Sequence, residues 1–124
     1  MTEKPWSKHY KPGVPHEIDA DAHSSIWAMS AAAIEKFGDA AAFSNFGADL
    51  SFNDIDRLSE NFAAYLQNEL GLKKGDRVAI MSPNIMAFPV TMFANIRAGL
   101  VQVNVNPLYT PRELEHQLND ADTD

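Results

Sequence analysis

The fold is decided by residues 77–105, which read RVAIMSPNIMAFPVTMFANIRAGLVQVNV. Residues 77–81 form a short, nearly continuous apolar run, which is typical of an internal strand covered on both faces. Residues 100–105 form a second run of strand-forming residues after an intervening helical segment. Two strands joined by a helix through short connections predict a parallel pair with a right-handed crossover.

The segment between the two runs predicts a helix over residues 85–98. Asn84 is the expected cap, because an Asn side chain before a helix accepts a hydrogen bond from its first turn. Gly99 is the expected stop, and Pro89 is expected to bend the helix one turn in.

The sequence after the second strand predicts another helix. Thr110, Pro111 and Glu113 supply a capping residue, a proline at the first helical position and the carboxylate of a capping box. The order is therefore strand, helix, strand, helix. Because parallel sheets are usually covered on both faces and extended at both edges, a further strand is expected after Asp124, and the chain is interpreted as cut within a sheet.

The sequence before the first strand predicts a helix, a hairpin and a second helix. The first helix is expected to be capped by Ser24 or Ser25, to run to about residue 37 and to stop at Gly38, and short strands are expected over 41–46 and 50–52. Ser51 and Asp54 form a second capping box. An apolar stripe then continues to a stop at Gly71, and its members are Ile55, Leu58, Phe62, Tyr65 and Leu66.

Residues 1–22 are expected to form an extended arm, and residues 23–124 a partial domain. The arm carries Pro5, Pro12 and Pro15 without sustained periodicity. Its Trp6 and Tyr10 are expected to dock on some surface, because a wholly solvated tail rarely carries two large aromatic side chains.

Composition excludes several classes of function. The chain has 124 residues, 10 Lys+Arg against 17 Asp+Glu, a net charge of −7 and no cysteine. The acidic balance argues against nucleic acid, which draws its affinity from clustered Lys and Arg. The lack of cysteine excludes disulfides, a thiol nucleophile and Cys-ligated zinc. With no apolar leader at its amino end and no unbroken membrane span, the chain is expected in the cytoplasm.

No residue is assigned to catalysis, cofactor binding or metal binding. His9, His16 and His23 recur every seven residues, but proline and glycine in that segment prevent a helix that would align them. His116 lacks a neighbour at the spacing of a base and nucleophile, so we interpret it as a surface histidine. The acidic residues Asp120, Asp122 and Asp124 lack the ligand spacing of a calcium loop.

Several stretches together resemble the amino-terminal region of the acyl-adenylate-forming (AMP-binding) ligases, and among them the bacterial long-chain fatty acid–CoA ligases. They are residues 50–66, residues 71–84 and, most specifically, residues 97–114, which read RAGLVQVNVNPLYTPREL. The arm also resembles that subfamily in Pro5-Trp6, Tyr10 and Gly13-Val14-Pro15. The resemblance implies an α/β fold in which this chain is an incomplete βαβα part of the large amino-terminal domain, preceded by the arm, a helix and a short hairpin.

The resemblance also implies an activity for the parent enzyme. Such ligases use ATP and Mg²⁺ to convert a fatty acid to an acyl-adenylate and then transfer the acyl group to coenzyme A. Their Ser/Thr/Gly-rich phosphate loop, their adenine- and ribose-binding motifs and their carboxy-terminal lysine have no counterpart in these residues. The chain alone is therefore expected to bind none of these cofactors and to be inactive.

Two alternatives remain open at this point. One is an adenylating enzyme for another carboxylic acid, such as an aryl or amino acid. The other is a non-catalytic interaction module that uses its arm to bind a partner. The resemblance further allows a homodimer formed through the arm and peripheral contact with the inner membrane.

Overall fold

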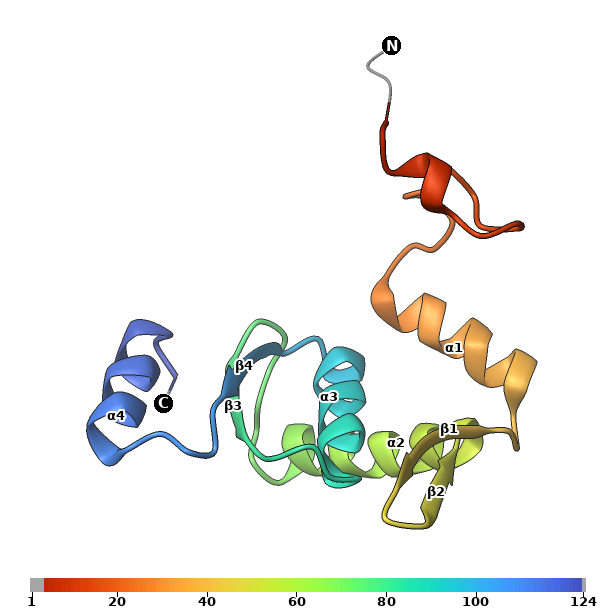
Figure 1. Ribbon diagram of the computed structural model, residues 1–124. Helices are drawn as coiled ribbons and strands as arrows, with labels where there is room; N and C mark the ends of the chain where they lie inside the picture. The colour runs from red at the N-terminus through yellow and green to blue at the C-terminus, as the bar shows by residue number, and fades with distance from the viewer. Residues whose placement is uncertain (1–3, 124) are drawn as a thin grey trace.

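The computed structural model describes residues 4–123. Its elements follow one another along the chain from a single 3-10 turn to a carboxy-terminal helix (Figure 1). They are η1 (Ser7–His9), α1 (Ile26–Phe37), β1 (Ala41–Asn45), β2 (Ala48–Ser51), α2 (Phe52–Asn68), β3 (Arg77–Met81), α3 (Ala87–Ala98), β4 (Val101–Val105) and α4 (Pro111–Asp120).

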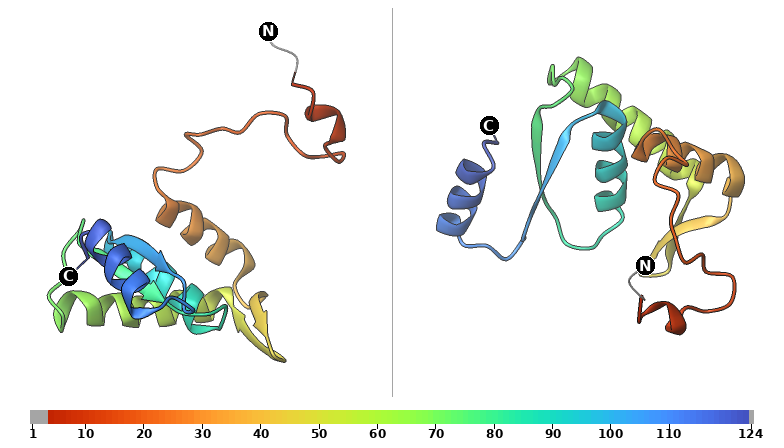
Figure 2. Two further views of the ribbon diagram at one scale, coloured as in Figure 1. Left: turned by 60° about the vertical axis from the view of Figure 1, so that its left-hand side comes forward. Right: turned by 90° about the horizontal axis from the view of Figure 1, so that it is seen from above.

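Two small sheets organise these elements. Strands β1 and β2 pair antiparallel as a hairpin, and β3 and β4 pair parallel with Arg77 opposite Val101 and Met81 opposite Val105. Helix α3 makes the crossover between β3 and β4. Two views place α3 and α4 on opposite sides of the parallel pair (Figures 1 and 2). The predicted βαβα unit is thus confirmed.

The core lies where α2 and α3 pack against each other and against the start of β4. Its buried members are small or aliphatic, and they are Ala63, Leu66, Ala94, Ala98 and Leu100. Phe62, Leu72 and Val78 pack around this cluster. Small side chains let the axes of these two helices approach closely.

Both predicted capping boxes are present. Ser51 Oγ accepts from the backbone N–H of Asp54 at 3.0 Å, and the Ser51 backbone N–H donates to the Asp54 carboxylate at 3.2 Å. Thr110 and Glu113 make the same reciprocal pair at the start of α4, with Pro111 at the first helical position. Ser25 caps α1, and Gly38 and Gly99 follow α1 and α3 as expected.

The expected start of α3 is wrong. The helix begins at Ala87, and its cap residue Met86 makes no side-chain hydrogen bond, whereas Asn84 lies three residues earlier. Pro89 therefore falls in the first turn. No bend is needed there, because the backbone N–H that proline lacks has no intrahelical acceptor in the first turn.

Three other expectations need smaller corrections. The hairpin strands end at Asn45 and begin again at Ala48, so the turn is Phe46-Gly47 and not Gly47–Asp49. Helix α2 ends at Asn68, three residues before the expected stop at Gly71. Strand β3 buries Ile80 and half-buries Val78, whereas alternate residues are exposed, so the described chain covers only one face of it.

The predicted arm lies at the edge of the molecule. Residues 4–24 contain η1 and stand apart from the packed helices in both figures (Figures 1 and 2). Lys4 pairs with Glu17, and the Tyr10 ring stacks on His16 with centroids 5.6 Å apart. Residues 1–3 of the predicted arm lie outside the described part, and the division at residue 22 stays a prediction.

Candidate functional site

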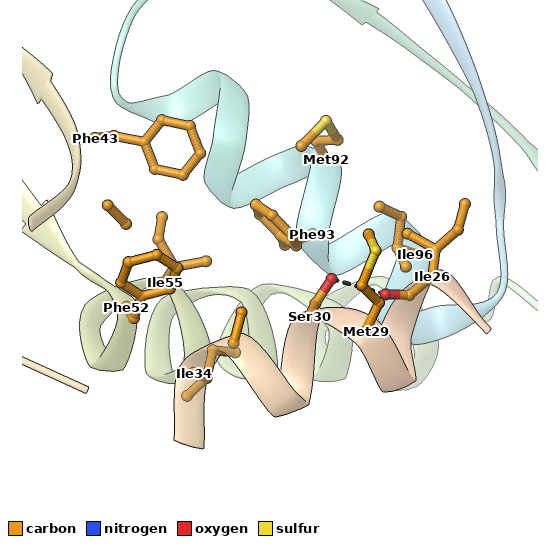
Figure 3. A pocket seen from close by; sticks show the side chains of 12 residues that line it. Ile26, Met29, Ser30, Ile34, Phe43, Phe52, Ile55, Met92, Phe93 and Ile96 are labelled. Carbon is orange, nitrogen blue, oxygen red and sulfur yellow. Dashed lines mark hydrogen bonds between the residues drawn. The ribbon is translucent and has the colours of Figure 1, made fainter. Parts of the chain in front are cut away.

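An apolar cavity with a volume of about 620 Å³ lies between α1, the hairpin, α2 and α3 (Figure 3). This volume is within the range of small-molecule sites. It is lined by Ile26, Met29, Ser30, Ala33, Ile34, Ala42, Phe43, Phe52, Ile55, Met92, Phe93 and Ile96.

Helical and strand spacing bring this lining together. The α1 residues recur every three or four positions and so form one stripe, while α3 contributes Met92, Phe93 and Ile96 from the opposite wall. The rings of Phe43 and Phe93 meet edge to face with centroids 6.3 Å apart. Sequence reasoning did not identify this cavity, because its four walls come from segments far apart in the chain.

The chemistry of the cavity is limited to apolar contact. Its one lining hydroxyl, on Ser30, donates to the Ile26 carbonyl oxygen at 2.8 Å and is thereby satisfied (Figure 3). None of the twelve lining residues carries an ionisable side chain. The cavity therefore offers neither an acid, a base nor a cation for a phosphate.

A charged cluster fastens α1 to the helix pair. The Arg97 guanidinium lies 3.9 Å from the centroid of the Trp27 ring, and its Nη2 donates to the Asp56 carboxylate and, at 3.2 Å, to the Asp56 carbonyl oxygen. The Arg97 side chain is only 20% exposed. Because one residue contacts both α1 and α2, we assign it a structural role.

The structure does not assemble the histidines into a site. Within residues 4–123 no three histidine, aspartate or glutamate side chains lie close enough together to hold a metal ion. His116 lies on α4 in a shallow surface depression with Thr110, Arg112 and Glu113. Asp122 pairs with Arg77 at 2.7 Å, and Asp124 lies outside the described residues.

The carboxyl groups with lowered pKa values also have structural roles. The Ser51 backbone N–H, followed by the Arg57 guanidinium and the Ser51 hydroxyl, lowers the pKa of Asp54. The Thr110 backbone N–H and then its hydroxyl lower the pKa of Glu113 in the same way. A hydrogen bond from Lys4 lowers the pKa of Glu17 in the arm. Each group is held ionised, which suits capping and pairing more than proton transfer.

A row of amides crosses β4, and sequence reasoning missed it. Asn95 is fully buried, and its Nδ2 lies 3.4 Å from Gln102 Oε1. Gln102 Nε2 donates to Asn104 Oδ1 at 2.7 Å, and Gln117 Nε2 donates to the Asn104 carbonyl oxygen at 2.9 Å. The available signal was the alternation of amides with valines along the strand. These contacts link α3, β4 and α4.

No helix within residues 4–123 has the length and apolar character that crossing a membrane requires.

Comparison with known proteins gives the family context. A family model described as AMP-binding enzyme matches residues 30–124. The long-chain-fatty-acid–CoA ligase of Yersinia pestis is 52% identical over 119 residues, which are 96% of this chain and 21% of that protein. The ligase of the same description from Bacillus subtilis is 38% identical over 121 residues, 98% of this chain and 21% of that protein. The chain thus spans about a fifth of the length of these curated relatives.

Solved structures agree with this fold. The NpsA N-terminal subdomain from Klebsiella oxytoca, in complex with 3-hydroxyanthranilyl-AMSN, superposes with a TM-score of 0.76 at 25% identity. The superposition covers 80% of this chain and 25% of that chain.

Proposed function

The chain belongs to the AMP-binding enzyme family, and on that premise we propose that it supplies the amino-terminal part of a long-chain fatty acid–CoA ligase. The observation that carries the proposal is the match of nearly the whole chain, at 52% identity, to a curated protein of that description. The reaction would join a fatty acid to coenzyme A through an acyl-adenylate, at the expense of ATP.

The apolar cavity between α1, the hairpin, α2 and α3 does not suit ATP or Mg²⁺. A triphosphate needs clustered backbone N–H groups, cations or a metal ion, whereas this cavity is lined without any charged side chain. Residues 4–123 also lack three potential metal ligands in one place. We therefore assign this chain a framework role and place nucleotide, metal and coenzyme A binding in other parts of the enzyme.

The framework role has a physical basis in the helix pair and the parallel strands. The core positions β3 and β4 against α2 and α3, and the amide row ties β4 to α4. Ligands of open α/β sheets bind outside the carboxyl ends of the strands. A segment that fixes two such strands would position that crevice without contributing reactive groups.

Formation of acyl-CoA by the product of the complete reading frame tests this proposal. The assay supplies ATP, Mg²⁺ and coenzyme A with palmitate, 4-coumarate or an amino acid in parallel. Turnover with palmitate is the expected result. Turnover with only an aryl or amino acid would instead support the alternative, an adenylating enzyme for another carboxylic acid. The observation that favours this alternative is the similarity to the NpsA subdomain, which was solved with 3-hydroxyanthranilyl-AMSN.

We further propose a cytoplasmic enzyme whose arm forms a homodimer contact. Support comes from the exposed aromatic side chains of the arm, among them Trp6 at 55% exposure. Sedimentation velocity of the complete product with and without residues 1–22 tests this. If the arm forms the dimer contact, deletion should lower the sedimentation coefficient to that of a monomer. A decrease that the mass of the deleted residues fully accounts for would refute the dimer contact.

A further inference from the structure

The parallel pair has two outer edges, one on β3 and one on β4. The Val101 backbone N–H donates to the Asp76 carbonyl oxygen at 2.9 Å, so Val101 directs its backbone groups toward β3. Successive residues of a paired strand direct these groups to alternate sides. The N–H and C=O groups of Ala79 in β3, and those of Gln102 and Asn104 in β4, therefore point to the two outer edges.

A side chain of α4 occupies the outer edge of β4. Gln117 donates from its Nε2 to the Asn104 carbonyl oxygen at 2.9 Å, and this oxygen is one of the backbone acceptors on that edge. A further strand beside β4 would compete for the same acceptor, because the ladder of a sheet uses the outward carbonyl groups. The contact therefore favours β4 as the outermost strand.

Helix α4 crosses from the outer edge of β4 toward β3. Gln117 lies in the second half of the helix and contacts β4, whereas Asp122, just after the helix, pairs with the Arg77 guanidinium at 2.7 Å. Arg77 is the first residue of β3. The described chain thus ends close to the amino end of β3, which is where a strand parallel to β3 begins.

The handedness of the connections points to the same edge. Helices α3 and α4 lie on opposite sides of the parallel pair (Figures 1 and 2). Connections between parallel strands are right-handed in about 98% of cases. A right-handed connection through the opposite face moves in the opposite direction along the sheet. Because α3 leads from β3 to β4, α4 leads back past β3.

We infer that the outer edge of β3 pairs in parallel with the strand that follows residue 124 in the complete protein, while β4 remains the outermost strand. The inference rests on the proposed function, because the longer chain is expected from relatives of which this chain spans 21%. The resulting order is β4, β3 and then the following strand.

This order gives the loop after β3 a place beside the ligand crevice of the sheet. In open α/β sheets that crevice lies outside the carboxyl ends of the strands, where the winding direction reverses. Winding from β3 to β4 and then back past β3 is such a reversal, so residues 82–86 border the crevice. Asn45 of the hairpin holds this loop, because its Nδ2 donates to the Asn84 carbonyl oxygen at 2.7 Å.

Disulfide mapping in the complete reading-frame product tests the strand order. Ala79→Cys is combined with single cysteines at each of about ten positions after residue 124, and disulfides formed under mild oxidation are identified by mass spectrometry. Adjacent strands lie about 4.8 Å apart, within disulfide reach, whereas strands two apart lie about 10 Å apart and beyond it. We expect Ala79→Cys to form a disulfide with one or two of these positions.

Val103→Cys is the matched control, because Val103 lies directly opposite Ala79 in the register of the parallel pair. It should form no disulfide with the same positions. Circular dichroism confirms that each variant is folded. Hydrogen exchange of the unmodified product gives a second measurement without substitution, and the Ala79 amide should exchange about tenfold or more slowly than the Asn104 amide.

Three outcomes of the mapping contradict the inference. A disulfide with Val103→Cys alone would place the following strand beside β4, and disulfides with both or with neither would exclude pairing on β3 alone. Equal exchange of the Ala79 and Asn104 amides would also overturn it. Acyl-CoA formation from palmitate is measured in parallel. Its absence together with the expected disulfide refutes the proposed ligase and leaves the strand order standing.

Discussion

Single side chains determine where the helices of this chain begin. Asp54 and Glu113 each occupy the third position of a helix and accept from the backbone N–H of the capping residue. The two carboxylates satisfy donors that would otherwise lack a partner, and their negative charge opposes the positive end of the helix dipole. Both effects depend on ionisation, which makes helix stability depend on pH.

Asp54→Asn should reduce the pH dependence of unfolding. The folded-state pKa of Asp54 lies below its ordinary value of 3.8, so the carboxylate stabilises the fold above that value and this stabilisation disappears as the pH falls through the lowered pKa. The variant should melt at a lower temperature near pH 7 and show a smaller further loss on acidification. Thermal unfolding followed by circular dichroism from about pH 7 to about pH 2 measures this.

The matched control is Glu60→Gln, which removes an exposed carboxylate from the same helix away from its start. Its melting curve should follow that of the unmodified chain at every pH. A pH dependence in Asp54→Asn identical to that of the unmodified chain would contradict the role of the capping carboxylate.

Arg97 attaches α1 to α2 and α3 through side-chain contacts. Arg97→Ala removes the stacking on Trp27 and both hydrogen bonds to Asp56. We expect a loss of about 1–3 kcal/mol, because the group is mostly buried and its partners are charged or aromatic. Urea unfolding of the complete reading-frame product, followed by tryptophan fluorescence, measures the change.

Arg112→Ala is the control, since Arg112 is an exposed arginine on α4. It should change stability by no more than about 0.5 kcal/mol. Equal effects of the two substitutions would show that net charge, and not the Trp27 and Asp56 contacts, accounts for the loss.

At the scale of elements, close approach of α2 and α3 depends on small side chains. Ser59 and Ala94 are fully buried at this interface, and Ala63 is 3% exposed. Ala94→Leu adds three carbon atoms where the structure has no room, so we expect destabilisation of about 1–3 kcal/mol, measured by urea unfolding. Ala64→Leu, on the exposed face of α2, should stay within about 0.5 kcal/mol. Tolerance of leucine at both positions would contradict the packing described.

Sequence reasoning succeeded for elements whose signals are local. The capping boxes at Ser51 and Thr110 and the stops at Gly38 and Gly99 each depend on residues a few positions apart, and all four are present. It failed at the start of α3, because Asn84 is a good capping residue whose side chain is not used there. The backbone carbonyl of Asn84 instead accepts a hydrogen bond from the Asn45 side chain of the distant hairpin.

The candidate site was harder to predict than the fold. The apolar cavity takes walls from four elements, and the Arg97 cluster joins residues 27, 56 and 97. Such long-range juxtapositions have no periodic signal within one segment. The turn at Phe46-Gly47 was missed for a different reason, since phenylalanine is unfavourable at positive φ and the local sequence pointed to a turn at residues 47–49.

At the scale of the whole molecule, the 124-residue chain exposes much apolar surface. Met81 and Val101 of the parallel strands and Leu70 after α2 are each more than a third exposed. The parallel sheet has only two strands, and few large side chains are buried. A small core offsets little of the conformational entropy lost on folding, so the isolated chain should be marginally stable and prone to aggregate.

Hydrogen exchange of the isolated chain tests this expectation. Amides of residues 77–105 should exchange through frequent opening, and thermal unfolding should be broad. The complete reading-frame product provides the comparison, with strong protection expected over the same residues. A sharp two-state transition together with full protection in the isolated chain would contradict marginal stability.

A chimera tests the framework role most directly. The matched segment of the Yersinia pestis ligase is replaced by this chain, and acyl-CoA formation from palmitate is measured over a range of ATP concentrations after circular dichroism has confirmed folding. Our account predicts that the folded chimera keeps its activity with a KM for ATP within about threefold of the unmodified ligase, because the transplanted residues hold the fold and do not contact the nucleotide. A folded chimera that is inactive, or whose KM for ATP rises about tenfold or more, would contradict it.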